Sequence, residues 1–132
     1  MKTIIMSIKA RHFRNMVKGV KPYELRTTKP SAALPVTVLL CVSGTGGEIR
    51  GSFICREIED ATGWGQARIA KDACITTDEA EGYRRKAQSS GRRLYAWRVD
   101  DMRAGGDVLS IYDYGATRPP QSWCYAKARD EE

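Results

Sequence analysis

Three charged side chains near residue 24 have types and spacing that suit the recognition of an anion or a nucleobase. Lys21 supplies a point charge and Arg26 a planar guanidinium fork, and both bind phosphate or carbonyl oxygens well. Glu24 lies between these cations in the chain, so we expect its carboxylate to be ionised. It can then orient Lys21 or accept a hydrogen bond from the exocyclic amine of a base. The structural alternative is a cluster of salt bridges on the surface.

Hydrolysis at such a site would also need a nucleophile or an activated water. Thr27 and Thr28 are the nearest hydroxyls, while Ser122 follows two prolines that would fix the approach of a final strand. Lys21 could act as the base if its neutral form were favoured. A serine at the start of a strand more often bonds to the backbone. The candidate catalytic residues are Lys21, Glu24 and Ser122.

The basic residues are concentrated near the beginning of the chain. The 132 residues include 22 Lys and Arg against 16 Asp and Glu, which gives a net charge of +6. Residues 1–30 hold eight of these basic residues and one acidic residue, Glu24, so this segment carries +7. The asymmetry favours a localised basic surface and a polyanionic partner, with a basic surface that binds nothing as the alternative.

Residues 10–18 are predicted to form a short helix with a basic stripe, Arg11, Arg14 and Lys18, along one side. The apolar residues Phe13, Met16 and Val17 fall on the other side. Gly19 suits the end of this helix, and Pro22 prevents the helix from resuming. Together with the segment that follows, the basic stripe is predicted to bind nucleic acid. The residues of this predicted surface are Arg11, Arg14, Lys18, Lys21, Tyr23, Glu24 and Arg26.

Aromatic residues are the natural platforms for stacked bases. The candidates are Tyr23, Trp64, Trp123 and Tyr125. For each of them, packing in the core is the favoured alternative.

The cysteine and histidine pattern predicts neither a metal site nor a disulfide framework. Cys41, Cys55, Cys74 and Cys124 are widely spaced, without a C-x-x-C pair or a histidine cluster. His12 is the single histidine, and its place beside Arg11 favours a surface or packing role. We predict no cofactor.

Composition places the chain among ordinary globular proteins. It is 42% hydrophobic and 29% charged, and its length fits one domain over residues 1–132. No apolar run approaches the roughly 20 residues of a membrane span, and Ser7 and Lys9 come too early for a signal-peptide core. We expect a cytoplasmic protein with no membrane partner, and the oligomeric state stays open.

Strand-like segments outnumber helical ones. Predicted strands cover residues 3–7, 23–26, 36–43, 49–58, 94–99, 108–112 and 122–126. Besides residues 10–18, helices are predicted over 66–71 and from a capping box at 76–79 to Gly91. Residues 44–47 and 105–106 are predicted turns, and Gly51 is predicted to allow a bulge or a sharp bend. Because there is no regular βαβ rhythm, we predict an α+β fold, a small β-barrel or strongly bent mixed sheet flanked by short helices.

The segment from Gly19 to Arg26 has the pattern G-x-K-x-x-E-x-R and resembles the signature of ASCH domains, a branch of the PUA-like superfamily. Further similarity lies in Ser7-Ile8-Lys9, in the paired middle strands and in Tyr95-Ala96-Trp97. The run from Arg118 to Tyr125 is similar to phage and prophage members. Each motif is short, but their order along nearly the whole chain makes the resemblance more specific than any one of them.

The resemblance implies a PUA-like barrel with a cleft lined by this segment, in a bacterial or phage-encoded protein. It also implies binding of RNA or nucleotides and, in some members, hydrolysis. Members similar to N4-acetylcytidine amidohydrolases use a lysine and a threonine of this segment and a separate glutamate. Lys21 matches the lysine, but Glu24 stands in place of the threonine, so the expected hydroxyl is missing. Asp72 is the acid we consider for the third group.

These observations lead to hypotheses from different classes. The leading one is a module that holds RNA, including single strands, or a modified nucleotide in a basic cleft around Lys21, Glu24 and Arg26. The alternative is a metal-independent hydrolase, a ribonuclease or an amidohydrolase of acylated nucleosides, that uses Lys21 with a hydroxyl or carboxylate partner. A third is an adaptor that binds an acidic protein through the same basic surface. RNA affinity that falls with salt distinguishes the first, and turnover the second.

Overall fold

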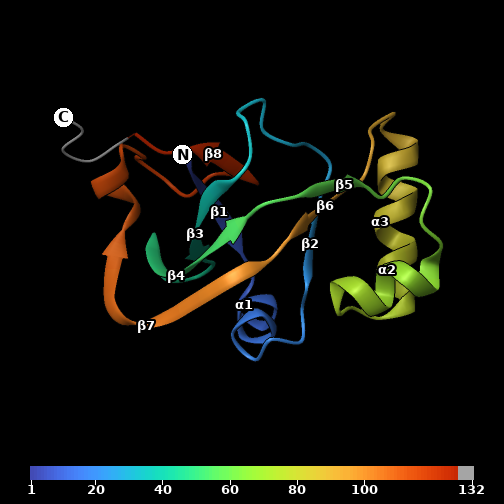
Figure 1. Cartoon of the computed structure of the whole chain (residues 1–132), viewed down its shortest axis with the longest axis horizontal. Coiled ribbons are helices and arrows are strands. Elements are labelled where there is room, and N and C mark those ends of the chain that lie inside the picture. The colour runs from blue at the N-terminus through green and yellow to red at the C-terminus, as the bar shows by residue number, and fades with distance from the viewer. Residues whose placement is uncertain (128–132) are drawn as a thin grey trace.

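The computed structural model describes residues 1–127, which form two β-sheets and three α-helices (Figure 1). In chain order the elements are β1 (Thr3–Ile8), α1 (Ala10–Val17), β2 (Tyr23–Arg26), β3 (Val36–Val42), β4 (Glu48–Cys55), β5 (Ile58–Asp60), α2 (Gln66–Ala73), α3 (Thr77–Ser89), β6 (Tyr95–Arg98), β7 (Asp100–Ser110), a 3-10 turn (Ile111–Tyr114) and β8 (Trp123–Tyr125). None of the helices within this range is long and apolar enough to cross a membrane.

The larger sheet has the strand order β7-β4-β3-β1-β8. β1 and β3 run parallel at its centre, and the other pairs are antiparallel. As predicted for a strand covered on both sides, β3 is buried at every position except Thr37. One face of the sheet carries a core that includes Ile4, Val38, Phe53 and Trp97, and the opposite face carries a smaller core around Ile5 and Leu39.

The smaller sheet, β2-β6-β5, packs against α2 and α3. These two helices lie side by side at one end of the molecule, and β8 lies towards the other end (Figure 1). Tyr23 and Leu25 of β2 belong to the core beneath the helices, while Glu24 and Arg26 face away from it and border a cleft. β2 therefore separates an apolar side from a polar side, as the alternation of its residues predicts.

The predicted α+β class with a mixed sheet is confirmed. The strands, however, do not close into a barrel, because β7 and β8 remain edges of the larger sheet and the β2-β6-β5 strands form a sheet of their own. The long strand predicted over residues 49–58 is interrupted after Cys55 and becomes β4 and β5, which belong to different sheets.

The turn predicted at Gly105–Gly106 is wrong, as is the separate strand over 108–112. Both glycines lie inside β7, which runs on to Ser110 and is followed by the 3-10 turn. Between the pairs Gly51–Ala104 and Ile49–Leu109, β7 has more residues than β4, so the register shifts. The two glycines have φ of +86° and +76°. They therefore form a bulge in the strand, because glycine adopts this backbone region without strain.

Gly51 allows α1 to lie close to the larger sheet. A Cβ at this position would lie 2.7 Å from the carbonyl oxygen of Arg103 on β7 and 2.8 Å from a ring carbon of Phe13 on α1. The predicted irregularity at Gly51 is confirmed, since the pairing of β4 with both neighbours shifts there. The absence of a side chain at residue 51 thus sets how closely α1 approaches the sheet.

Candidate functional site

The turn that ends α1 directs the chain inward, so that Lys21 is buried. Gly19, with φ of +77°, ends the helix: its N–H donates to Met16 O and the N–H of Val20 donates to Asn15 O. These two bonds make a Schellman motif, which needs the left-handed conformation that glycine adopts readily. The predicted role of Gly19 is confirmed, and β2 begins at Tyr23, directly after Pro22.

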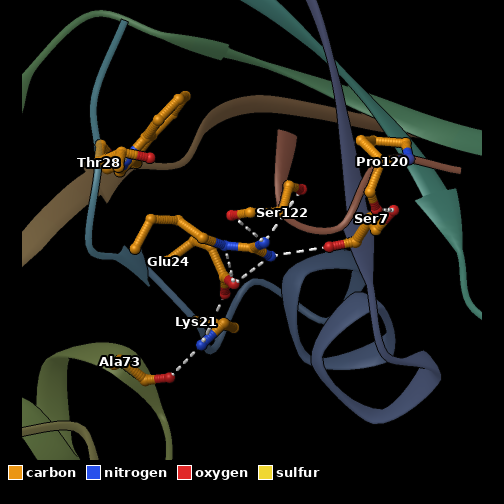
Figure 2. A network of polar contacts seen from close by, with 9 residues as sticks. Ser7, Lys21, Glu24, Thr28, Ala73, Pro120 and Ser122 are labelled. Carbon is orange, nitrogen blue, oxygen red and sulfur yellow. Dashed lines mark hydrogen bonds and ion pairs between the residues drawn. The ribbon is translucent and has the colours of Figure 1, made fainter. Parts of the chain in front are cut away.

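Lys21 is buried and fully engaged with the protein. Its side chain is 2% exposed, and its Nζ donates to the carbonyl oxygen of Ala73, the last residue of α2 (Figure 2). The same Nζ lies 3.3 Å from Oε1 of Glu24. The last carbonyls of a helix lack partners within the helix and carry the negative end of its dipole, so an ammonium group is favourable there. Lys21 therefore ties the start of β2 to the end of α2.

Glu24 forms ion pairs with two cations at once. Oε1 faces Lys21, and Oε2 accepts from Nε and Nη2 of Arg26 at 3.1 and 2.7 Å. Burial alone would raise the pKa of this carboxyl, but the charges of Arg26 and Lys21 outweigh burial, and the pKa lies below its usual value. Glu24 is therefore ionised at neutral pH. The three residues form a buried triad, and not the salt-bridge cluster on the surface that was the alternative.

Arg26 uses every donor that it has. Besides the two bonds to Glu24, Nη2 donates to the carbonyl oxygen of Ser7 at 2.8 Å. Nη1 donates to both the carbonyl and the hydroxyl oxygen of Ser122, at 3.2 and 3.1 Å (Figure 2). A guanidinium group has five N–H donors, and these five bonds occupy all of them. Arg26 thus joins β2 to the end of β1 and to the residue before β8.

A cleft of about 670 Å³ opens beside this network. Its lining comes from the end of β1 and the start of α1, from β2, from one face of α3 and from the segment before β8. The residues are Ser7, Lys9, His12, Glu24, Leu25, Arg26, Thr27, Ser43, Tyr83, Lys86, Ser90, Arg92, Gln121 and Ser122. Segments that are far apart in the sequence therefore meet around the buried carboxylate.

Three exposed cations border the cleft: Lys9, Lys86 and Arg92. Within residues 1–127, none of them forms an ion pair with a carboxylate. Sequence reasoning did not assign Lys86 to a site, because a basic residue near the end of a helix is explained by its dipole, and it gave no role to Arg92. The packing of α3 opposite β1 and α1 is the fact that brings them to the cleft.

The basic stripe of α1 does not border this cleft. Arg11 pairs with Glu79 at the start of α3, next to the capping box that Thr76 and Glu79 form as predicted. Arg14 and Lys18 line a separate hollow on another side of α1. Tyr23, also predicted to bind nucleic acid, donates its hydroxyl to Glu59 and packs edge-on against Trp64.

Two of the three hydroxyls considered for hydrolysis line the cleft, and the third binds a tryptophan side chain. Ser122 and Thr27 line the cleft. The hydroxyl oxygen of Thr28 accepts from the indole N–H of Trp123 at 2.8 Å, and the carbonyl oxygen of Thr28 accepts from Trp97. Asp72 lies on α2, forms an ion pair with Arg68 and is outside the cleft lining.

The other predicted stacking residues also have partners. Trp64 lies under the guanidinium of Arg68, 3.6 Å from the ring centre. Trp123 packs edge-on against both Trp97 and Tyr125, in accord with the packing alternative. The four cysteines are free thiols. Among the residues that the structure describes, no group of histidine, cysteine and carboxylate side chains is arranged to hold a metal ion.

His12 is a buried residue of the cleft that sequence reasoning assigned to the surface or to packing. It is 6% exposed, and its Nδ1 is enclosed without a hydrogen-bond partner among residues 1–127. Burial, and then the charge of Lys21, lower the pKa of His12 below 6.5. The imidazole is therefore neutral at pH 7 and adds no charge to the cleft.

The histidine gives the fold a dependence on pH that can be measured. Because the folded state binds this proton less readily than the unfolded chain, the associated stability is present above the unfolded pKa, about 6.5, and is lost as the pH falls towards the folded pKa. We expect the free energy of unfolding in urea to decrease between about pH 7.5 and 5.5. In His12→Gln the decrease should vanish, since the chain has one histidine. An equal decrease in both proteins would contradict the assignment.

No protein-family model matches the sequence, and no curated protein matches it either. Solved structures do match. The crystal structure of ASCH from Zymomonas mobilis has a TM-score of 0.76 at 18% identity, over 98% of this chain and 90% of that chain. A Tyr-to-Phe mutant of that protein gives 0.74 at 18% identity, over 95% and 90% of the two chains. A Ser-to-Ala mutant gives 0.74 at 16%, over 94% and 87%. The chain therefore has the ASCH fold, and identities this low establish the fold alone.

Proposed function

We propose that this chain, which has the ASCH fold, binds RNA or a modified nucleotide in the cleft around the triad of Lys21, Glu24 and Arg26. One observation carries the proposal: at its border the cleft has exposed cations that form no ion pair within residues 1–127, and in its lining it has a buried, ionised carboxylate. Its volume of about 670 Å³ lies within the range of roughly 300–1,000 Å³ typical of pockets for small ligands.

The border cations suit phosphate groups. Lys9 comes from the start of α1, while Lys86 and Arg92 come from α3 and the loop after it, so they approach a ligand from two sides. Phosphate contacts of this kind supply affinity and orientation without reading the base.

Polar groups in the lining would contact the base. Tyr83 offers a ring for stacking, and burial, followed by the negative charge of Glu24, raises the pKa of its hydroxyl, which therefore stays a donor. Gln121 and Ser90 add an amide and a hydroxyl. Among the described residues, Glu24 is the one carboxylate of the lining, and it would accept from an exocyclic amine.

The triad acts in this proposal mainly by fixing the cleft. All donors of Arg26 are occupied, so it contributes charge and holds Ser7 and Ser122 in place. Lys21 acts through Glu24 and is a positioning residue. Binding is supported better than hydrolysis, because Lys21 donates to Ala73 and pairs with Glu24, and a general base needs a free lone pair. A cytoplasmic location, where RNA and nucleotides are abundant, belongs to the same proposal.

The proposal is tested by fluorescence anisotropy with a labelled, short, single-stranded RNA over a series of salt concentrations. We expect the double variant Lys86→Gln/Arg92→Gln to bind about tenfold more weakly. The slope of log affinity against log salt should fall by about 0.7 for each phosphate contact removed.

The matched control is Arg14→Gln/Lys18→Gln, which removes the same charge from the separate hollow on α1. Its affinity should stay close to that of the unchanged protein. If the control weakens binding as much as the cleft variant, the affinity does not depend on the cleft in particular, and the assignment of the RNA to the cleft is contradicted. If neither RNA nor mononucleotides bind at low salt, the proposed function is rejected.

A further inference from the structure

The hollow beside α1 differs in chemistry from the cleft. It has a volume of about 410 Å³ and lies between α1 and the bulge of β7. Phe13 and Val17 line it from the helix, and Val108 lines it from the strand. Val17 is 49% and Val108 56% exposed, so two exposed aliphatic side chains border one concave surface, as is typical of interaction grooves. The glycine pair of the bulge adds no side chain, so the hollow stays open.

Cations surround these apolar side chains. Arg14 and Lys18 are exposed and form no ion pair within residues 1–127, whereas Arg50 is paired with Glu48. Among residues 1–127, Asp107 is the one carboxylate that lines the hollow. Together, the lining residues carry an excess of positive charge around an apolar centre, which complements an apolar group flanked by carboxylates.

Different sides of α1 line the hollow and the cleft. Lys9 and His12 face the cleft, and Phe13, Arg14, Val17 and Lys18 line the hollow. A ligand of one site therefore does not compete directly for the residues of the other.

We propose that the hollow docks an extended acidic segment of a partner protein. One aliphatic side chain of that segment inserts between α1 and the bulge of β7, and carboxylates on either side of it pair with Arg14 and Lys18. This proposal is independent of nucleotide binding in the cleft.

Two features favour a peptide over RNA as the occupant. The exposed apolar groups are aliphatic, and single-stranded RNA is recognised by aromatic stacking and by donors and acceptors for base edges. Phe13, the one aromatic residue of the lining among residues 1–127, has its ring close to Gly51 and packs against the core. Moreover, β7 is an edge strand, whose outer backbone groups pair with no other described strand, and extended peptides commonly bind at such edges.

The test is an NMR titration of the ¹⁵N-labelled chain with three probes. The first is the peptide acetyl-GDELEDG-amide, the second is the same peptide with serine in place of leucine, and the third is a short oligouridylate. We expect the first to shift the amides of residues 13–18 and 104–108. The serine peptide should bind about tenfold more weakly, because it buries no aliphatic side chain.

Variants assign the two parts of the interaction. Val108→Ser should lower affinity for the leucine peptide but not for the serine peptide, and Arg14→Gln/Lys18→Gln should lower both. Lys86→Gln/Arg92→Gln, with the same change of charge at the cleft, should lower neither. All substituted residues are exposed, and circular dichroism checks their folding.

Three results would overturn the proposal. They are the absence of shifts at millimolar peptide, equal affinity for the leucine and serine peptides, and stronger binding of oligouridylate than of the leucine peptide at the same amides. The last result would make the hollow part of an RNA surface.

Discussion

Replacing Arg26 with leucine is expected to lower the free energy of unfolding by about 3–5 kcal/mol. The substitution takes from Glu24 the partner of two hydrogen bonds and leaves a buried carboxylate with Lys21 alone. It also removes the donors to the carbonyl oxygens of Ser7 and Ser122. Urea denaturation followed by tryptophan fluorescence measures the loss.

Two further variants show whether this loss of stability comes from the buried network. Arg56→Leu breaks an exposed pairing with Asp101, where both side chains are 53% exposed, and should cost at most about 1 kcal/mol. Arg26→Lys keeps the charge but has neither five donors nor a planar fork, so we expect it to recover little of the stability. If Arg26→Leu costs no more than Arg56→Leu, the network does not hold the two sheets together.

Replacing Glu24 with glutamine should destabilise the fold by a similar amount, about 3–5 kcal/mol at pH 7. The variant leaves Lys21 and the partly buried Arg26 without a counter-charge. The same measurement over a range of pH separates this electrostatic effect from a packing effect, because glutamine and glutamate have nearly the same shape.

The pH dependence follows from the lowered pKa of Glu24. The stability that its charge provides is present above the unfolded pKa, about 4.3, and is lost as the pH falls through the folded pKa. The difference between the unchanged protein and Glu24→Gln should therefore shrink in acid. Glu79→Gln is the control: hydrogen bonds from Arg11 and from the backbone of Thr76 lower the pKa of Glu79 to about 2, but its side chain is partly exposed and should matter less. A difference that stays constant from neutral to acid pH would contradict the ionised triad.

The local structure of the chain was largely predictable from its sequence. The helix end at Gly19, the capping box at Thr76 and the alternation of β2 all depend on neighbouring residues, and local rules describe these well. The bulge at Gly105 and Gly106 was not predictable in this way. A pair of glycines has the same local signature in a turn and in a bulge, and only the pairing of β7 with β4 distinguishes them.

The candidate site was predictable in part. The spacing of Lys21, Glu24 and Arg26 indicated that the three act together. It did not indicate that they are buried or that Arg26 donates hydrogen bonds to Ser7 and Ser122. The position of Lys86 and Arg92 beside the cleft depends on how α3 packs, and no local sequence pattern predicts this packing. The net charge of residues 1–30 pointed to α1, where the structure divides the basic residues among a salt bridge, the hollow and the cleft.

The triad also gives a physical account of Glu24. A residue such as threonine would present a single side-chain oxygen at this position. One hydroxyl oxygen cannot neutralise both Lys21 and Arg26, whereas a carboxylate has an oxygen for each. Glutamate at this position suits a cleft whose buried charges are balanced within the protein.

The place of β1 in the larger sheet has a kinetic consequence. β1 is flanked by β3 and by β8, so residues near 5 pair with residues near 124. Contacts between such distant segments require the closure of a long loop and slow the search for the native state. The hydrogen bonds from Arg26 to Ser122 depend on the same late pairing of β8 with β1, because Ser122 directly precedes β8. During synthesis, the helices α2 and α3 can pack early, but the cleft can be assembled only after the ribosome has released residue 122.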